Sequence, residues 1–274
     1  MSYRFLKGHG TENDFVLLPD PDGRLDLTPQ RVAALCDRRA GIGGDGVLRV
    51  VRTAASGWSG ETGDAEWFMD YRNSDGSVSE MCGNGVRVFG RYLVDHEGVD
   101  PTQPLPVATR GGVKVLAFEQ PRGDRITVDM GQPRVFGSTV VSTHDHSWSA
   151  EHVSMGNPHA VVFVDDLDEA GPLLESPAYD DGVYPDGVNV EFVRRVGEHH
   201  VEMRVHERGS GETRSCGTGA CAVMVTAALA DDAPRGTTYR VDLPGGSLDI
   251  TWTEDDRVLM TGPAVIVATG ETDL

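Results

Sequence analysis

A short phrase that the chain contains twice restricts its fold more than any other feature of its 274 residues. The first copy is Met81-Cys82-Gly83-Asn84-Gly85-Val86-Arg87, and the second is Ser215-Cys216-Gly217-Thr218-Gly219-Ala220-Cys221. Each copy leads into a segment in which apolar residues recur with helical spacing. Cys82 and Cys216 lie 216 − 82 = 134 residues apart, about half the chain. A repeat at a fixed offset indicates an internal duplication, so we expect two similar halves.

Shorter similarities extend the duplication beyond the cysteines. Asn73 and Glu207 each stand nine residues before their cysteine (82 − 73 = 9 and 216 − 207 = 9). Residues 13–16 are similar to 157–160, and residues 47–50 are similar to 190–193. We therefore predict an α/β (α+β) protein with two homologous domains, residues 1–120 with Cys82 and residues 121–274 with Cys216. The division is expected at residues 119–124, with the last strand able to pack back on the first domain, and the active site is expected in the interdomain cleft.

Apolar periodicity and turn residues place the expected elements. Strands are predicted over residues 4–7, 15–18, 47–52, 67–73, 107–109, 113–118, 125–130, 139–142, 151–155, 160–164, 188–193, 201–206, 240–243, 247–252 and 258–261. Helices are predicted from the N-cap Thr28 to residue 39 and over residues 85–95, 167–174 and 220–230. The last of these helices is apolar nearly all round, so it should be buried on all sides. Residues 8–14 are expected to form a polar turn.

Charge and cysteine content exclude several classes of function. The formal net charge is −19, whereas nucleic acid and anionic membranes bind basic surfaces, so neither is an expected partner. The sequence shows no signal peptide and no apolar run of the roughly 20 residues that a membrane helix needs, so a cytoplasmic protein is expected. The four cysteines form no Cys-x-x-Cys pair, which argues against a structural zinc site.

Several other features are explained by structure alone. The glycine-rich residues 41–46 precede a strand, whereas a dinucleotide-binding loop follows a strand and opens a helix, so no nucleotide site is predicted. Cys36 and Cys221 lie on buried faces of predicted helices and are expected to be core residues. Judged from the residues alone, the following polar side chains are as compatible with turns or solvated pairs as with a site: Asn13, Asn73, Asn157, His159, Asn189, Glu207 and Arg208.

A thiol at the start of a helix has unusual chemistry. The positive end of the helix dipole and the unpaired backbone N–H groups favour the thiolate, and the same N–H groups bind carboxylates. The flanking glycines let the backbone approach a ligand closely. One such cysteine is compatible with a buried structural residue, with the nucleophile of a transferase, or with a binding protein that turns nothing over.

Two such cysteines favour a different reaction. Inversion of a stereocentre by proton transfer needs a base on one face of the carbon and an acid on the other. A thiolate and a thiol in similar surroundings can supply both and titrate as one coupled pair. Because an amino-acid α-proton is weakly acidic, the two helix N-termini would have to stabilise the carbanion. Cys82 and Cys216 therefore predict an amino-acid racemase or epimerase.

The phrases and their neighbours resemble the diaminopimelate epimerases over essentially the whole chain. The matching segments are residues 8–15, 41–48, 73–87, 156–159, 187–192 and 207–219. The resemblance implies two similar domains, each with a strand-rich, barrel-like layer around a central helix. It also implies an isomerase that uses neither pyridoxal nor metal nor any other cofactor. Its reaction would interconvert LL- and meso-2,6-diaminoheptanedioate on the route to lysine and peptidoglycan precursors.

The resemblance also assigns roles to residues. Cys82 and Cys216 match the acid/base pair, and His159 and Glu207 match positions thought to tune the two thiols. The substrate-binding positions of the family fall on Asn13, Asn73, Gly83, Asn84, Asn157, Asn189, Glu207, Arg208, Gly217 and Thr218. The implied partners are a small diamino diacid and a second copy of the chain, as a homodimer.

Three positions depart from the family pattern. Gly46 stands where many members carry glutamine, so a side-chain contact is lost there. Glu12 replaces a glycine that is common in the first turn. Ala268 falls where some members have an aromatic residue thought to support the dimer.

Overall fold

The computed structural model describes residues 2–119, 125–143 and 146–273. The chain divides into two compact units: unit 1 is Met1–Val128 with Gly262–Leu274, and unit 2 is Asp129–Thr261. The expected division at residues 119–124 lies, apart from residue 119, outside the described residues. Residues 125–128 and 262–274 belong to unit 1. The sequence had placed residues 121–274 in the second domain, with the last strand able to pack back on the first.

Unit 1 is a curved sheet with one long helix and one short helix. Its elements are β1 (Tyr3–Gly10), β2 (Asn13–Pro19), α1 (Pro29–Cys36), β3 (Gly46–Arg52), η1 (Thr53–Ala55), β4 (Trp67–Asn73), α2 (Gly83–His96), β5 (Leu105–Thr109), β6 (Gly112–Phe118), β7 (Arg125–Gly131) and β18 (Val265–Thr272). The strands pair in the order β18-β1-β2-β3-β4-β5-β6-β7. The pairs β2–β3 and β4–β5 are parallel, and the other pairs are antiparallel.

Unit 2 repeats this pattern. Its elements are β8 (Arg134–Ser142), β9 (Ser147–Ser154), β10 (Pro158–Phe163), η2 (Leu167–Ala170), β11 (Ala178–Tyr179), β12 (Asn189–Gly197), β13 (His200–Glu207), β14 (Gly211–Thr213), α3 (Gly217–Ala230), β15 (Thr238–Leu243), β16 (Gly246–Trp252) and β17 (Val258–Pro263). The main order is β8-β9-β10-β12-β13-β15-β16-β17, with β10–β12 and β13–β15 parallel. Because order and direction match strand for strand, the duplication inferred from the sequence is confirmed.

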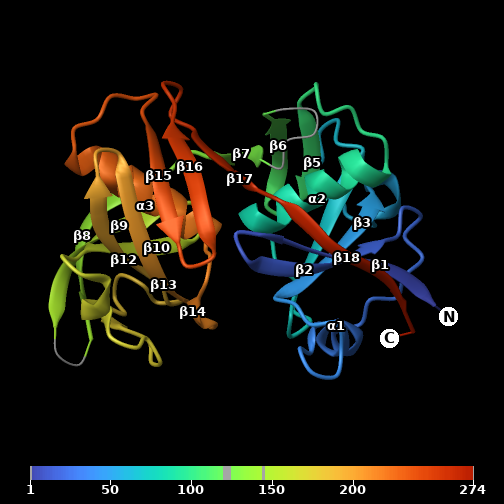
Figure 1. Cartoon of the computed structure of the whole chain (residues 1–274), viewed down its shortest axis with the longest axis horizontal. Helices are drawn as coiled ribbons and strands as arrows, with labels where there is room; N and C mark the ends of the chain where they lie inside the picture. The colour runs from blue at the N-terminus through green and yellow to red at the C-terminus, as the bar shows by residue number, and fades with distance from the viewer. Residues whose placement is uncertain (1, 120–124, 144–145, 274) are drawn as a thin grey trace. The chain divides into compact units, whose positions relative to one another are not determined.

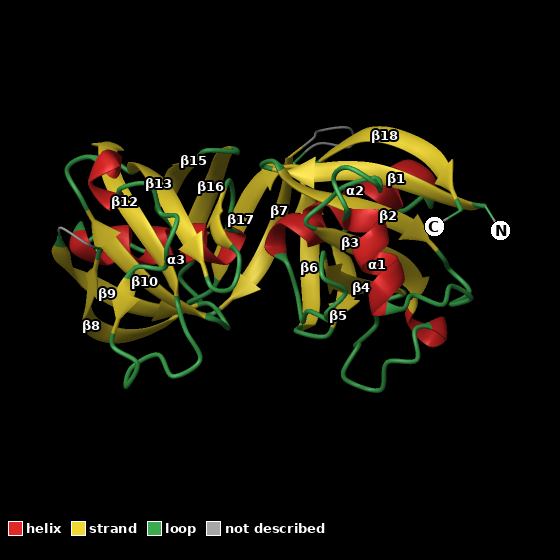
Figure 2. Ribbon diagram, turned by 90° about the horizontal axis from the view of Figure 1, so that it is seen from below, coloured by secondary structure: helices red, strands yellow, loops and turns green. Residues whose placement is uncertain are grey.

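Each unit wraps its sheet around one helix (Figures 1 and 2). In unit 1, α2 contacts β18 and β1 to β6, and in unit 2, α3 contacts β9, β10, β12, β15 and β16. The α3 side chains are buried almost from end to end, as expected for a helix that is apolar on every side. The strand-rich layer around a central helix is therefore confirmed. None of the helices among the described residues is long and apolar enough to cross a membrane.

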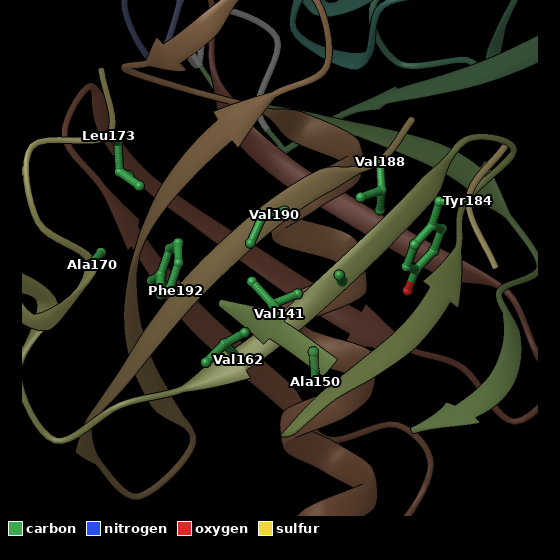
Figure 3. Packing of buried hydrophobic residues seen from close by; sticks show 10 residues of the cluster. Val141, Ala150, Val162, Ala170, Leu173, Tyr184, Val188, Val190 and Phe192 are labelled. Carbon is green, nitrogen blue, oxygen red and sulfur yellow. The ribbon is translucent and has the colours of Figure 1, made fainter. Parts of the chain in front are cut away.

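The other face of each sheet carries a second apolar layer. In unit 2 the layer includes Val141, Val190 and Phe192, with Ala170 and Leu173 from the segment between β10 and β12 packed onto it (Figure 3). In unit 1 the corresponding layer includes Val16 and Val47 and is covered by α1. Side chains alternate between the faces of a strand, so residue 191, between two outer-layer residues, points toward α3.

Local structure differs from expectation at several places. Residues 8–14 are not one polar turn, because β1 continues to Gly10 and pairs with β2 from Asn13. Only Thr11 and Glu12 form the turn, with φ values of 49° and 60°, as type I′ hairpins require at both central positions. Residues 167–174 form only the short turn η2, because Gly171 with φ 69° and the following proline end it. The strands β11, β14 and β18 were not predicted.

The first helix begins as predicted. The Thr28 side chain accepts a hydrogen bond from the Arg31 backbone N–H at 3.3 Å, and Pro29 occupies the first turn. The helix ends at Cys36, three residues before the predicted end, because the Asp37 side chain accepts from the N–H groups of Arg39 and Ala40 at 2.7 Å. These bonds turn the chain into the glycine-rich loop that leads to β3.

Candidate active site

Cys82 and Cys216 occupy the same structural position in their units. Each is the N-cap of the central helix, with φ/ψ of −136°/122° at Cys82 and −123°/111° at Cys216. The backbone N–H of Gly85 donates to Cys82 Sγ at 3.4 Å, and that of Gly219 donates to Cys216 Sγ at 3.4 Å. Each sulfur thus lies at the positive end of a helix dipole, which stabilises a thiolate.

The surroundings of Cys82 in unit 1 are mostly amide groups. The Cys82 thiol donates to Asn13 Oδ1 at 3.5 Å, and Asn84 Nδ2 donates to the same oxygen at 3.2 Å. Asn13 Nδ2 in turn donates to Asp45 Oδ2 at 2.7 Å. Behind them the fully buried Arg87 donates from Nη2 to Asn84 Oδ1 at 2.9 Å. Three of the predicted site residues of this unit, Asn13, Cys82 and Asn84, therefore form one hydrogen-bonded group.

Asn73 and Gly46 face each other at the start of β3. Their Cα atoms are partners in the β3–β4 register, and Asn73 Nδ2 donates to Ser77 Oγ at 2.9 Å. A Cβ atom at Gly46 would lie only 2.4 Å from the carbonyl oxygen of Arg72. A larger residue at this position therefore requires a shift of this backbone, and glycine fits the close approach.

The surroundings of Cys216 in unit 2 form a chain of polar contacts. Thr218 Oγ1 lies 3.6 Å from Cys216 Sγ, and Asn157 Nδ2 donates to Thr218 Oγ1 at 3.3 Å. Asn157 Oδ1 lies 3.0 Å from Nε2 of His159, and Nδ1 of His159 lies 2.6 Å from Glu191 Oε1. His159, the predicted tuning residue, thus connects to the thiol of its own unit through Asn157 and Thr218.

Burial raises the pKa of the Cys216 thiol well above its usual value, and the nearby carboxylates of Glu207 and Glu191 add to this effect. The hydrogen bonds from Thr218 and from the Gly219 N–H act in the opposite direction. Glu207 itself accepts a hydrogen bond from the Thr213 hydroxyl. Burial and the two carboxylates thus favour the neutral thiol of Cys216, which can donate a proton, whereas Thr218 and the helix N-terminus favour its thiolate.

Asn189 and Arg208 form a second group in unit 2. Asn189 Nδ2 donates to the Pro158 carbonyl at 3.1 Å, and the Arg208 N–H donates to Asn189 Oδ1 at 2.9 Å. The Arg208 guanidinium donates to the carbonyl of Asp186 at 3.0 Å. A cavity of about 220 Å³ is lined by Pro158, Asp186 and Arg208, among others. This group can present a guanidinium to a carboxylate in the cavity.

The other two cysteines are core residues, as predicted. Cys221 is fully buried in α3, and Cys36 is buried at the end of α1. Burial raises the pKa of the Cys36 thiol to about 11. Within the described parts of the chain, no group of three or more His, Cys, Asp or Glu side chains is arranged to hold a metal ion.

Two charged residues next to the site were not singled out in the sequence. Arg87 lies inside the first phrase, and Glu191 lies in the segment aligned with residues 47–50 of the first half. The signal for Glu191 was an acidic residue inside an apolar strand, where the repeat has Leu48. The signal for Arg87 was a charged residue at the repeat position of the core residue Cys221 (221 − 87 = 134).

Comparison with known protein families gives a specific match. A family model described as diaminopimelate epimerase matches residues 5–136 and 152–267. Diaminopimelate epimerase of Streptomyces coelicolor is 61% identical over 277 residues, covering 98% of this chain and 95% of that protein. Diaminopimelate epimerase of Thermobifida fusca is 49% identical over 282 residues, covering 99% of this chain and 98% of that protein.

Comparison with solved structures gives more distant matches. A phenazine biosynthesis protein of the PhzF family from Bacillus anthracis has a TM-score of 0.71 at 15% identity, with full coverage of both chains. A hydroxyproline epimerase from Agrobacterium vitis has a TM-score of 0.69 at 16% identity, covering 99% of this chain and 91% of that one. At these identities the likeness shows a shared fold.

Proposed function

The chain belongs to the diaminopimelate epimerase family, and we propose that it interconverts LL- and meso-2,6-diaminoheptanedioate with Cys82 and Cys216 as acid and base. Family membership confirms the resemblance found in the sequence. The proposed enzyme is a cofactor-independent isomerase, an amino-acid epimerase of lysine and peptidoglycan-precursor biosynthesis. Its substrate is a small diamino diacid.

The observation that carries the proposal is the equivalence of the two cysteines. Both are N-caps of the central helix of their unit, and both accept one backbone N–H at 3.4 Å. A nucleophile that forms a covalent intermediate needs only one such thiol. An inversion by two bases needs two, one for each face of the carbon.

The proton transfers follow from this pairing. One cysteine thiolate takes the α-proton, so the C–H bond breaks, an S–H bond forms and the electron pair remains on the α-carbon and its carboxylate. The other cysteine then gives its thiol proton to the opposite face of that carbon and becomes a thiolate. The reverse reaction exchanges the roles. Backbone N–H groups at the helix starts, from Gly83, Asn84, Gly217 and Thr218, stabilise the negative charge on the α-carboxylate.

The remaining predicted residues are proposed to bind and orient the substrate. Asn13 accepts from the Cys82 thiol and Asn157 donates to Thr218 beside Cys216, which suits both amides to hold the reacting end. Arg208 and Asn189, with Asn73 and Glu207, are proposed to bind the distal amino-acid group. His159 and Glu207 are proposed to adjust the proton affinity of the thiols. Two similar units thereby present different side chains to the reacting end and to the distal end of the substrate.

The proposal extends to the assembly and the location of the protein. We expect a homodimer in the cytoplasm, with no nucleic-acid or membrane partner. The net charge of −19 supports the absence of polyanionic partners, because these bind basic surfaces. Ala268, where some relatives have an aromatic residue, lies in β18 opposite Lys7. Sedimentation of Ala268→Tyr beside the unaltered protein tests how this position bears on the dimer.

The test uses the purified protein with LL-diaminopimelate and no added cofactor. We expect meso product, and deuterium at the α-carbon when the reaction runs in deuterated water. Cys82→Ala and Cys216→Ala should each lose epimerisation by at least about 1,000-fold, because one face of the carbon then lacks its acid or base. Thr226→Ser, a buried change in α3 away from its N-terminus, is a control that should remain active.

Two results would reject the proposal. Near-normal epimerisation by both single cysteine variants would exclude the two-base reaction. A substrate-derived covalent adduct on one cysteine, with no change of configuration, would indicate a transferase instead.

A further inference from the structure

Glu191 and His159 form a buried acid–base pair directly under the N-terminus of α3. Both side chains are fully buried, and they lie on the adjacent parallel strands β12 and β10. Glu191 Oε1 is 2.6 Å from His159 Nδ1. The same oxygen would lie 2.6 Å from a Cβ atom on Gly219, the residue whose N–H donates to Cys216 Sγ. The carboxyl group therefore packs against the backbone that supports the thiol.

The fold does not require a polar pair at this place. In unit 1 the equivalent positions are Phe15 and Leu48, which lie under Gly85 in the same manner: a Cβ atom there would be 3.5 Å and 3.2 Å from their side chains. Burial of a carboxyl group costs several kcal/mol unless it is fully satisfied. Among the described residues, Glu191 Oε2 has no hydrogen-bond partner. An apolar pair would therefore stabilise unit 2 at least as well, so the polar pair needs another explanation.

The direction of the polar contacts defines where the protons are. Asn157 donates from Nδ2 to Thr218 Oγ1 at 3.3 Å, so its Oδ1 faces His159 Nε2 at 3.0 Å. An oxygen acceptor there requires a hydrogen on Nε2. The remaining proton of the pair lies between His159 Nδ1 and Glu191. Whichever of the two groups carries this proton, the pair has no net charge. Loss of that proton would bury a net negative charge and leave two acceptors facing each other.

We propose that Glu191 is a positioning residue that holds a hydrogen on His159 Nε2 and thereby orients Asn157 and Thr218 toward Cys216. The Asn157 carboxamide then occupies an acceptor site of Thr218 Oγ1 with its NH₂ group. The Thr218 hydroxyl hydrogen is left to point at Cys216 Sγ, 3.6 Å away. Such a bond stabilises the thiolate form, the form in which Cys216 accepts the α-proton. Only the expected effect of Glu191 on turnover rests on the proposed function.

Burial and the charged groups around Glu191 change the pKa of its carboxyl group. Burial raises the pKa of the Glu191 carboxyl, Glu207 on β13 adds to the increase, and His159 on β10 opposes it. Glu191 in turn acts on Cys216 at the start of α3 and on Tyr184, whose pKa burial raises. A neutral Glu191–His159 pair limits the negative charge beside the thiol.

Three variants separate positioning from packing. Glu191→Gln keeps the shape, and its NH₂ group can donate to Nδ1, which preserves the hydrogen on Nε2. Glu191→Leu copies Leu48 of the repeat and removes the hydrogen bond. Phe192→Leu, on the same strand but in the outer apolar layer, is the packing control. We expect kcat within about threefold of normal for Glu191→Gln and for Phe192→Leu. Glu191→Leu should lose about 10- to 100-fold in kcat, the worth of one hydrogen bond to a charged group.

The decisive readout is nitrogen NMR of ¹⁵N-histidine protein without substrate, with the His159 signals assigned from a His159→Gln sample. In the unaltered protein and in Glu191→Gln, Nε2 should carry a hydrogen. In Glu191→Leu, a mixture of the two neutral tautomers is expected. A bare Nε2 in the unaltered protein would overturn the proposal even if the protein epimerises normally. Normal kcat and an unchanged His159 signal in Glu191→Leu would also overturn it.

Discussion

Alanine at the second glycine of each phrase, Gly85 or Gly219, should change the stability of the two units in opposite directions. Gly85 and Gly219 are both the third residue of the central helix, and each donates its N–H to the cysteine. A Cβ atom at Gly219 would lie 2.6 Å from Glu191 Oε1 and 3.2 Å from Cys216 Sγ. At Gly85 the nearest atoms are Leu48 Cδ2 at 3.2 Å and Cys82 Cβ at 3.4 Å. The same substitution therefore meets a buried carboxylate in one unit and a flexible methyl group in the other.

The magnitudes follow from these distances. Ordinary contact begins near 3.4 Å, so the neighbour must move about 0.8 Å (3.4 − 2.6) at Gly219 but only about 0.2 Å (3.4 − 3.2) at Gly85. Replacement of a helical glycine by alanine gains up to about 1 kcal/mol, and overpacking of a core costs about 1–3 kcal/mol. Gly85→Ala should thus be neutral or stabilising by up to about 1 kcal/mol. Gly219→Ala should be destabilising by about 0–2 kcal/mol.

Urea and thermal unfolding of both variants measure this difference. A change of 1 kcal/mol shifts Tm by about 2–4 °C in a chain of 150–250 residues, and this chain is slightly longer. Combination of Gly219→Ala with Glu191→Asp, which shortens the acidic side chain, should recover part of the loss, and the coupling energy is read from the double-mutant cycle. If Gly219→Ala is as stable as Gly85→Ala, the carboxyl group does not lie where the packing argument needs it.

Three further predictions concern other parts of the chain. Burial and nearby carboxylates raise the Cys216 pKa well above 9.0, so the rate of Cys216 alkylation should still increase above pH 9.0. Mass spectrometry of the labelled peptide measures this rate, and a plateau at lower pH would contradict the prediction. Glu12→Gly should stabilise unit 1 by up to about 1 kcal/mol in urea, because φ is 60° there and glycine has no penalty at positive φ. Thr28→Ala should cost about 1 kcal/mol in the same assay through loss of the N-cap bond, and an unchanged midpoint would refute the cap.

The sequence by itself determined the features that depend on local chemistry. The repeated Cys-Gly-x-Gly phrase placed Cys82 and Cys216 at helix starts, because an N-cap depends only on residues in the first turn of the helix. The apolar composition of residues 220–230 was enough to bury α3, since a helix without a polar side has no face for water. Thr28 followed by proline marked the first helix start. Each of these signals lies within a few residues along the chain.

The tertiary structure decided the features that depend on pairing between distant segments. Thr11 and Glu12 carry no sequence signal for a type I′ turn, and the β1–β2 ladder on both sides holds them at positive φ. Residues 262–274 join unit 1 because β18 pairs with β1 at the opposite end of the chain. His159 and Glu191 are 32 residues apart, and only the parallel pairing of β10 with β12 under α3 brings them to 2.6 Å. The spacing of apolar residues in the sequence identifies each helix or strand, but the order of strands in the sheet decides which distant residues come into contact.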